Sequence, residues 1–150
     1  MSDAKICLVS SCGGHLAELR ALHSAYDRFE HFFVINDRSI QLPEEMEGRT
    51  FFIRHAERDL KVLVNLVEAY RILKRERPDV ILSTGAGPAV PFALVGKVLG
   101  IPSVFVEISA HVVRPSLTGR IMYFLADRFY YQWPKLERFF PRACYGGLLY

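Results

Sequence analysis

Three short segments rich in glycine, serine and histidine contain the residues best suited to chemistry. They are residues 10–15 (Ser-Ser-Cys-Gly-Gly-His), 83–88 (Ser-Thr-Gly-Ala-Gly-Pro) and 107–111 (Glu-Ile-Ser-Ala-His). Each follows a short, mostly apolar run that is typical of a buried parallel strand. Open parallel sheets bind ligands outside the carboxyl ends of their strands, near the point where the strand order reverses. We therefore expect the three segments to form one site.

The first two segments have the features of a phosphate-binding turn. In the first, a Gly-Gly pair opens a helix, where backbone N–H groups are unpaired and the helix end carries partial positive charge. The second segment repeats the arrangement. Either one alone is also compatible with a plain strand-to-helix turn, but two of them at facing strand ends favour a pyrophosphate. The predicted pyrophosphate ligands are Ser11, Gly13, Gly14, Thr84, Gly85 and Gly87.

Two residues are candidates for acid–base catalysis. His15 lies on the first turn of the expected helix, where the positive helix end favours a neutral imidazole that can take a proton from a hydroxyl. Glu107 ends an apolar strand, where a carboxylate is costly unless it faces a cleft or finds a donor. Both residues have a structural alternative: His15 could simply orient its loop, and Glu107 could cap the loop that follows it.

Two arginines flank the turn at residues 115–119 (Pro-Ser-Leu-Thr-Gly). The guanidinium groups of Arg114 and Arg120, together with the hydroxyls of Ser116 and Thr118, suit phosphate oxygens. A surface position is the ordinary alternative for each arginine. Residues 7, 12 and 15 (Cys, Cys and His) lack the spacing of a metal site, so we expect no metal. His23, His31 and His55 lie away from the expected strand ends and receive no role.

Short β-rich runs alternate with longer helical patterns along the chain. Such alternation predicts one α/β domain over residues 1–150, a Rossmann-like doubly wound parallel sheet. The expected strands are residues 5–10, 31–35, 50–53, 79–84, 103–107 and 128–132, and the expected helices are residues 15–25, 59–77, 89–99, 116–126 and 134–139. Asp59 can cap the second helix, Ser116 or Thr118 can cap the fourth, and residues 36–48 form a polar loop.

The helix expected at residues 59–77 has more apolar residues than a surface helix needs. Its apolar positions fill well over half of the circumference, whereas an ordinary surface helix needs a stripe of only about 100°. Deeper burial within the chain explains this excess most simply. Contact with a partner is the alternative.

Composition and charge exclude several classes of protein. The chain has 150 residues, of which 51% are hydrophobic, and no apolar run is long enough to span a bilayer. Three cysteines are few, and an odd number cannot all pair within the chain, so we expect no disulfide framework and a reducing compartment. We also expect no signal peptide, because a strand-like segment begins within the first residues.

The charge is distributed unevenly along the chain. Residues 1–110 hold thirteen basic and fourteen acidic residues, whereas residues 111–150 hold six basic and two acidic residues. This basic C-terminal third suits phosphate-bearing ligands, an anionic membrane surface or a solvated edge.

A dinucleotide-binding site is a further interpretation of the glycine-rich first turn. Asp37 follows the second expected strand, where such folds place an acidic residue. However, the G-x-G-x-x-G fingerprint is missing, because residues 11–17 offer only two adjacent glycines. A nicotinamide-dependent oxidoreductase is therefore a weak hypothesis.

Several motifs together resemble one protein family. They are residues 10–16 (Ser-Ser-Cys-Gly-Gly-His-Leu), 83–91 (Ser-Thr-Gly-Ala-Gly-Pro-Ala-Val-Pro), 115–120 (Pro-Ser-Leu-Thr-Gly-Arg), 132–133 (Gln-Trp) and 145–147 (Tyr-Gly-Gly). In this order they resemble the acceptor-side subunits of two-component glycosyltransferases. These subunits include bacterial capsule and exopolysaccharide proteins and the eukaryotic anchoring subunit of the dolichol-pyrophosphate N-acetylglucosamine transferase. The chain differs from the family at Cys12, often a serine, and at residues 108–111, where members commonly have Ser, an aromatic residue, a small residue and Arg.

The resemblance implies a fold equivalent to the N-terminal half of a GT-B glycosyltransferase. In that architecture the N-terminal domain binds the acceptor, and here a separate nucleotide-sugar-binding subunit would supply the other half. A distant single-chain relative transfers N-acetylglucosamine to the peptidoglycan lipid intermediate, and its glycine-rich loops are thought to hold the pyrophosphate of the lipid. By this resemblance the histidine of its Gly-Gly-His motif corresponds to His15, and its glutamate-bearing loop after strand five corresponds to Glu107.

The implied activity is an inverting transfer from a UDP-sugar to a polyprenyl-pyrophosphate-linked saccharide in exopolysaccharide or capsule biosynthesis. The alternative is a non-catalytic scaffold that recruits and activates the partner at the membrane. No tightly bound cofactor is expected, because the UDP-sugar is a co-substrate held mainly by the partner. The expected partners are that subunit, the lipid-linked acceptor and a membrane surface, with no nucleic acid. The expected location is cytoplasmic, peripheral on the inner face of the plasma membrane.

Overall fold

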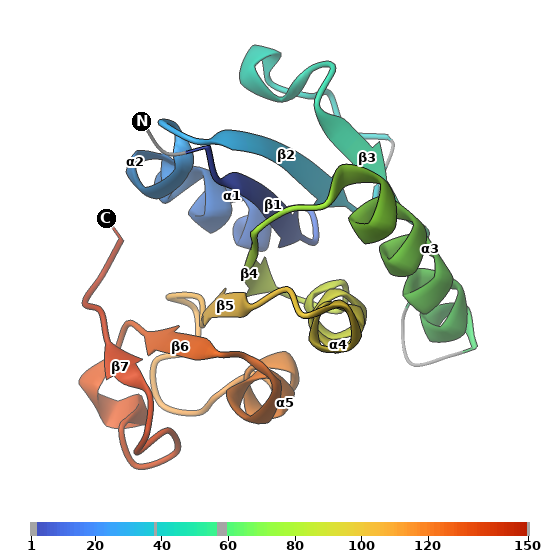
Figure 1. Ribbon diagram of the computed structural model, residues 1–150. Coiled ribbons are helices and arrows are strands. Elements are labelled where there is room, and N and C mark those ends of the chain that lie inside the picture. The colour runs from blue at the N-terminus through green and yellow to red at the C-terminus, as the bar shows by residue number, and fades with distance from the viewer. Residues whose placement is uncertain (1–2, 38, 57–59, 150) are drawn as a thin grey trace.

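A seven-stranded sheet forms the centre of the molecule (Figure 1). The computed structural model describes residues 3–37, 39–56 and 60–149. All strand pairs are parallel and the strand order is β3-β2-β1-β4-β5-β6-β7. The strands are β1 (Lys5–Ser10), β2 (Glu30–Ile35), β3 (Thr50–Phe52), β4 (Val80–Gly85), β5 (Ser103–Val106), β6 (Arg128–Tyr131) and β7 (Cys144–Tyr145). The order reverses between β1 and β4, which confirms the predicted doubly wound parallel sheet.

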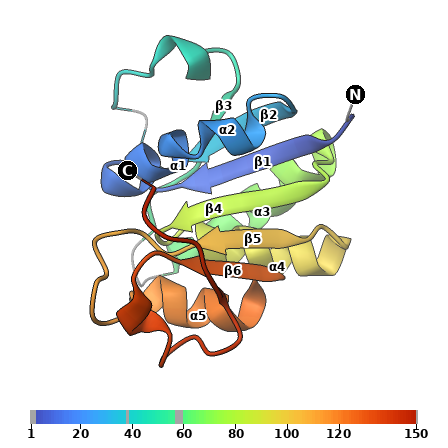
Figure 2. The same ribbon diagram turned by 90° about the vertical axis from the view of Figure 1, so that its left-hand side faces the viewer.

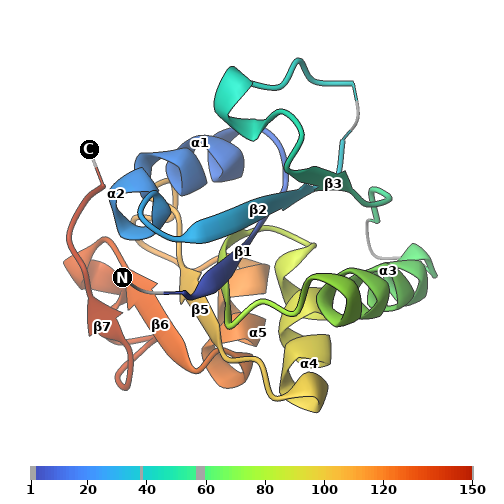
Figure 3. The same cartoon turned by 45° about the horizontal axis from the view of Figure 1, so that its top comes forward.

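Helices cover both faces of the sheet, and the strands end at one common edge (Figures 2 and 3). α1 (Gly14–Ala21) and α2 (His23–Tyr26) pack over β1 and β2 on one face. α3 (Lys61–Glu76), α4 (Ala89–Leu99) and α5 (Leu117–Leu125) lie along the other face, with α4 between α3 and α5. The 3-10 turns η1 (Glu44–Met46) and η2 (Pro134–Leu136) complete the elements.

Apolar strand residues separate into cores on the two faces because successive side chains of a strand point to opposite sides. Cys7 and Val9 of β1 pack toward α3 and α4, whereas Ile6 and Leu8 pack toward α1. A third cluster, which includes Phe105, joins α4 and α5 to β5 and β6. This burial on both faces is why the strand sequences are nearly continuous apolar runs.

Several element boundaries differ from those predicted. A seventh strand of two residues follows the six that were expected, and the expected last helix is only the 3-10 turn η2. The first expected helix is divided, because the turn at Leu22 separates α1 from α2. Ser116, the first of two candidate caps, starts α5: its Oγ accepts a hydrogen bond of 2.8 Å from the Gly119 N–H. The proposed cap Asp59 lies outside the described residues.

The apolar excess of α3 is exposed, so the interpretation that it is buried within the chain is wrong. Asn65, Ala69 and Leu73 form the buried side of the helix, while Leu63 is 59% exposed and Val67 is 50% exposed. Leu66 and Ile72 pack at the edge of the core beneath this helix, so only part of its apolar surface is covered. Among the described helices, none combines the length and the apolar character needed to cross a membrane.

Candidate functional site

The two glycine turns lie side by side and are hydrogen-bonded to each other. The backbone N–H of Ser11 donates to the carbonyl oxygen of Gly85 over 2.8 Å, and the Ala86 N–H donates to Ser11 Oγ over 3.1 Å. These bonds connect the end of β1 with the end of β4, where the strand order reverses. The sequence-based expectation that the two turns face each other is confirmed.

His15 and Thr84 form a reciprocal pair between the same two turns. Thr84 Oγ1 donates to the His15 carbonyl oxygen over 2.6 Å, and His15 Nδ1 lies 2.8 Å from the Thr84 carbonyl oxygen. Because a carbonyl oxygen only accepts, Nδ1 must be the protonated nitrogen. In the neutral imidazole, Nε2 therefore carries the lone pair that a general base requires.

Two glycines of these turns have backbones that favour glycine. Gly13 has a φ of 83° and precedes the first residue of α1, whose N-terminal N–H groups follow it. Gly85 has a φ of 95°, and a β-carbon there would lie 3.2 Å from Nδ1 of His15. Gly85 thus leaves space for the His15 ring to rest against the β4 turn.

A cavity of about 830 Å³ opens at this edge of the sheet. Five of the predicted site residues line it: His15, Gly85, Gly87, Ser116 and Thr118. Two further histidines, His55 and His111, and apolar residues that include Val90, Phe105 and Ile121 complete its wall. A mostly apolar cavity lined by a few polar groups suits an amphiphilic ligand.

His55 lines the cavity although no role was assigned to it. It follows the end of β3 by three residues, so the same strand-end rule that selected His15 would also have selected it. Asn36, at the end of β2, holds it: Asn36 Nδ2 lies 2.9 Å from His55 Nδ1, while Asn36 Oδ1 accepts from the Cys12 N–H over 3.2 Å. Asn36 therefore joins the β1 turn to the loop after β3.

Glu107 is buried behind the cavity and holds the start of α5. Its carboxylate, 1% exposed, accepts hydrogen bonds from the Ser116 N–H over 3.0 Å and from Ser116 Oγ over 2.8 Å. A negative carboxylate at this helix N-terminus is stabilised by the helix dipole. The geometry is that of the capping role, and the catalytic role of Glu107 stays a prediction.

The remaining predicted ligands lie outside the cavity lining. Thr84 is fully buried, and its hydroxyl donates to the His15 carbonyl oxygen. The Ser11 hydroxyl accepts from the Ala86 N–H of the β4 turn. Gly13, just before α1, and Gly14, its first residue, are both exposed. Arg114 and Arg120 line a separate depression with Arg138 and Phe139. Their proposed contact with the same pyrophosphate as the glycine turns is not supported by this placement.

A buried carboxylate that sequence reasoning missed connects α1 with the loop after β5. Glu18 Oε1 accepts from the Ser109 N–H over 2.8 Å and also from the Ser109 hydroxyl. Glu18 Oε2 accepts from Gln132 Nε2 over 2.6 Å, and the same Gln132 nitrogen donates to the Glu107 carbonyl oxygen over 3.0 Å. Trp133 Nε1 donates to the Ser109 carbonyl oxygen over 2.6 Å. This junction fixes the loop that carries Glu107 and His111 relative to His15.

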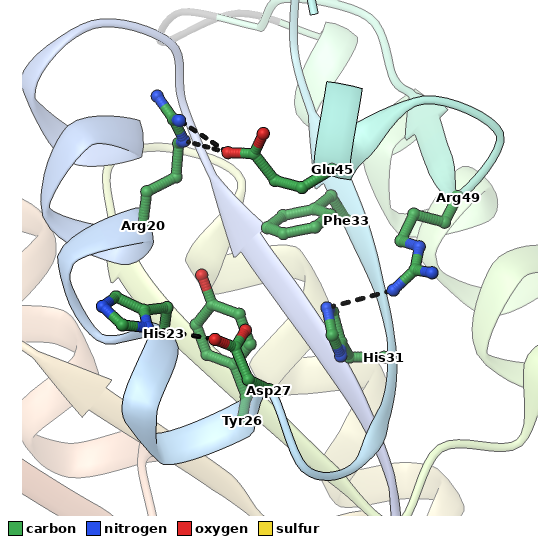
Figure 4. Close-up of a pocket in the computed structure, with 8 residues that line it drawn as sticks. All are labelled: Arg20, His23, Tyr26, Asp27, His31, Phe33, Glu45 and Arg49. Carbon is green, nitrogen blue, oxygen red and sulfur yellow. Dashed lines mark hydrogen bonds and ion pairs between the residues drawn. The ribbon is translucent and has the colours of Figure 1, made fainter. Parts of the chain in front are cut away.

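A second pocket, of about 450 Å³, lies over the other end of α1 (Figure 4). Several polar side chains of its lining bond to one another: Arg20 to Glu45 at 2.5 Å, His23 to Asp27 at 3.0 Å, and Arg49 to His31 at 3.3 Å. Burial raises the pKa of Tyr26, in its wall, to about 12. The Arg20–Glu45 pair fastens the loop that contains η1 to α1, so this pocket has a structural explanation. Within the described ranges, no cluster of three or more histidine, cysteine or acidic residues could hold a metal.

The fold is shared with solved structures of MurG and of UDP-GlcNAc 2-epimerases. Acinetobacter baumannii MurG superposes with a TM-score of 0.73 at 17% identity, over 87% of this chain and 42% of that chain. UDP-GlcNAc 2-epimerase from Methanocaldococcus jannaschii gives a TM-score of 0.70 at 13% identity, over 92% of this chain and 42% of the other. The chain thus spans less than half of these enzymes. Its class is the Rossmann-like domain that GT-B glycosyltransferases share with such epimerases.

Sequence comparison assigns the family. The model of the family described as "Oligosaccharide biosynthesis protein Alg14 like" matches residues 56–149, and the chain belongs to this family. The human protein named "UDP-N-acetylglucosamine transferase subunit ALG14" is 27% identical over 176 residues, covering 95% of this chain and 81% of the human protein. The part of the resemblance that concerns the eukaryotic anchoring subunits is confirmed.

Proposed function

We propose that this chain is the acceptor-side subunit of a two-component glycosyltransferase. The observation that carries the proposal is the His15–Thr84 pair: it directs a histidine with a free Nε2 to a cavity bordered by glycine turns. Relatives named as subunits of a UDP-N-acetylglucosamine transferase support the same activity.

The diphosphate of a polyprenyl-linked saccharide binds at the two glycine turns. The N-terminal N–H groups of α1, beside Gly13 and Gly14, meet the phosphate oxygens from one side. Gly85 and Gly87 meet them from the other side, with no side chain to hold the ligand away. The apolar wall near Val90 and Ile121 contacts the prenyl chain, and Ser116 and Thr118 contact the saccharide.

The transfer inverts the anomeric centre of the donor sugar. The acceptor hydroxyl oxygen attacks C1 of the UDP-sugar, the bond from C1 to the diphosphate breaks, and UDP leaves with the electron pair. The hydroxyl proton passes to Nε2 of His15, while the Thr84 carbonyl oxygen stabilises the resulting imidazolium through Nδ1–H. General-base assistance of this kind accelerates reactions by about 10²–10⁴-fold.

A separate subunit holds most of the UDP-sugar. The chain corresponds to 42% of the single-chain MurG structure, about one of the two domains that a GT-B enzyme needs. Little or no transfer is therefore expected from this chain alone. UDP-N-acetylglucosamine is the first donor to test, ahead of the glucuronic acid and galactose derivatives.

The exposed apolar surface of α3 supports a peripheral location on a membrane. Leu63, Val67 and Tyr70 are exposed along one side of this helix, and Leu60, just before it, is exposed as well. Apolar side chains presented in this way insert at the boundary between headgroups and acyl chains. We place the protein on the cytoplasmic face of the plasma membrane, with undecaprenyl diphosphate as the acceptor lipid and exopolysaccharide or capsule assembly as its setting.

A non-catalytic scaffold is the second candidate, and the position of Glu107 favours it. The carboxylate is buried and hydrogen-bonded to Ser116, so it presents no exposed oxygen to a substrate hydroxyl. In this alternative the chain recruits the partner to the lipid, and the partner performs the chemistry by itself.

Reconstitution with the nucleotide-sugar-binding subunit tests the proposal. We expect His15→Gln to lower kcat by about a hundredfold or more while partner binding is retained, because general-base catalysis is lost. His23→Gln, which changes an exposed histidine outside the cavity, is the matched control and leaves the rate unchanged. An unchanged rate for His15→Gln, together with slow transfer by the partner alone, would support the scaffold instead.

A further inference from the structure

Three arginines surround one depression beside the start of α5. Arg114 comes from the loop after β5, Arg120 from the first turns of α5, and Arg138 from the segment after η2. The depression has a volume of about 460 Å³ and Phe139 forms part of its wall. The segment after η2 is held against α5 by the packing of Phe140 on Tyr123, whose ring centroids lie 5.2 Å apart.

The charges of these arginines are not compensated within the described part of the chain. No carboxylate of residues 3–37, 39–56 or 60–149 forms an ion pair with any of the three guanidinium groups, whereas Arg20 is paired with Glu45. Like charges around one hollow repel each other, so an anion placed between them is stabilised by all three. Helix α5 itself offers little to an anion, because Glu107 already occupies its N-terminus.

The side chains suit phosphate in particular. A guanidinium group presents a planar set of donors that matches two oxygens of a phosphate. The guanidinium of Arg138 lies 4.8 Å from the centroid of the Phe139 ring, and this stacking reduces the conformational freedom that phosphate binding would cost.

Exposed apolar residues adjoin the arginines, which favours a lipid over a soluble anion. At about 100° per residue, Leu117, Ile121 and Phe124 form one stripe on α5, and Arg120 lies on the edge of that stripe. Phe124 is 73% exposed and Leu117 is 53% exposed. Val113, also exposed, immediately precedes Arg114. Basic groups beside exposed Leu and Phe residues are typical of surfaces that bind anionic bilayers.

We propose that Arg114, Arg120 and Arg138 form a second phosphate-binding site, which takes the headgroup phosphate of an anionic membrane lipid. The proposal deepens the membrane location within the proposed function and rests on it. The site is separate from the glycine turns, so lipid binding here and acceptor binding there occur together. It also orients the cavity, because the apolar stripe of α5 includes Ile121, which lines the cavity wall.

Vesicle binding tests the site without partner or acceptor. The full chain is titrated with vesicles of phosphatidylglycerol in phosphatidylcholine and with vesicles of phosphatidylcholine alone. The triple variant Arg114→Gln, Arg120→Gln, Arg138→Gln is compared with a matched triple variant, Arg28→Gln, Arg75→Gln, Arg128→Gln. The control arginines are also exposed but lie outside the depression. A parallel titration with inorganic pyrophosphate measures the response to a soluble anion.

We expect the site variant to bind the anionic vesicles about a hundredfold more weakly than the wild type. The reason is that each arginine near an anionic surface strengthens binding about fivefold, and three are removed. The control variant is expected to lose much less affinity, and binding to neutral vesicles to be weak for all three chains. Equal losses in both variants, or equal binding to the two vesicle types, would overturn the proposal. If the chain binds pyrophosphate but binds anionic and neutral vesicles equally well, the assignment of this site to a lipid is wrong. Transferase activity on a short-chain acceptor in detergent is measured separately, so that failure of the proposed function is recognised on its own.

Discussion

The carboxylate of Glu107 occupies the space in which Gly119 would carry a β-carbon. That carbon would lie far inside van der Waals contact with Glu107 Oε2, and 2.9 Å from Ser116 Oγ. The buried carboxylate therefore depends on a glycine in the first turn of α5, and α5 depends on the carboxylate that caps it. The motif at residues 115–120 thus has a structural role alongside any role in binding.

Gly119→Ala tests this dependence. The added methyl group must displace Glu107 from its hydrogen bonds with Ser116, so we expect a loss of about 2–3 kcal/mol in the free energy of unfolding. Urea denaturation measures the loss. Gly14→Ala is the matched control, because Gly14 has a helical backbone and a β-carbon there meets no atom within 4 Å. The prediction is wrong if the two variants are equally stable.

Glu18→Ala tests the junction that holds the loop after β5. Removal of the carboxylate leaves the Ser109 N–H and one donor of Gln132 without their acceptor. Each buried group that loses its partner costs about 1–3 kcal/mol, so we expect a loss of about 2–4 kcal/mol in stability. Hydrogen exchange of the Ser109 amide should also accelerate more than that of the β1 amides.

The conservative variant Glu18→Gln separates the hydrogen bonds from the charge. Its amide oxygen can still accept from Ser109, so we expect it to retain most of the protection of the Ser109 amide. Equal acceleration of exchange in Glu18→Gln and Glu18→Ala would contradict an account based on this hydrogen bond.

Tyr26 contributes to stability in a pH-dependent way. Its pKa is raised by burial from 10.0 to about 12, so the phenol ionises more readily in the unfolded chain. This contribution is fully present below pH 10 and is lost as the pH rises toward 12. We expect Tyr26→Phe to reduce the fall in stability across this range, as measured by denaturation at a series of pH values. A fall of the same steepness in both proteins would contradict this role.

The sequence predicted the elements that depend on local pattern and on strand order. Paired glycine turns at the ends of two strands must meet at the point where the strand order reverses, and His15 was found for this reason. The direction in which a side chain points from such a turn could not be predicted from the sequence. Thr84 and Ser11 point into the turns and hold them together, which depends on backbone angles that the sequence pattern does not specify.

The Glu18 junction and the α3 surface were beyond sequence reasoning for another reason. Glu18 meets Ser109 and Gln132 across separations of 91 and 114 residues, so only the folded chain brings them together. On α3, the sequence showed apolar residues over more than half of the circumference, but this pattern does not specify which of them face the sheet. His55 was the exception, because its position after a strand was a usable signal.

Acceptor binding tests the central claim most directly. An isotope-labelled chain is titrated with a short-chain polyprenyl diphosphate saccharide, and its amide resonances are followed, with the corresponding monophosphate as the control. The account predicts that the diphosphate shifts the amides of Gly14, His15, Gly85 and Gly87 first, and that the monophosphate binds more weakly. Saturable binding that leaves those four amides unchanged, with shifts confined to other parts of the molecule, would contradict it.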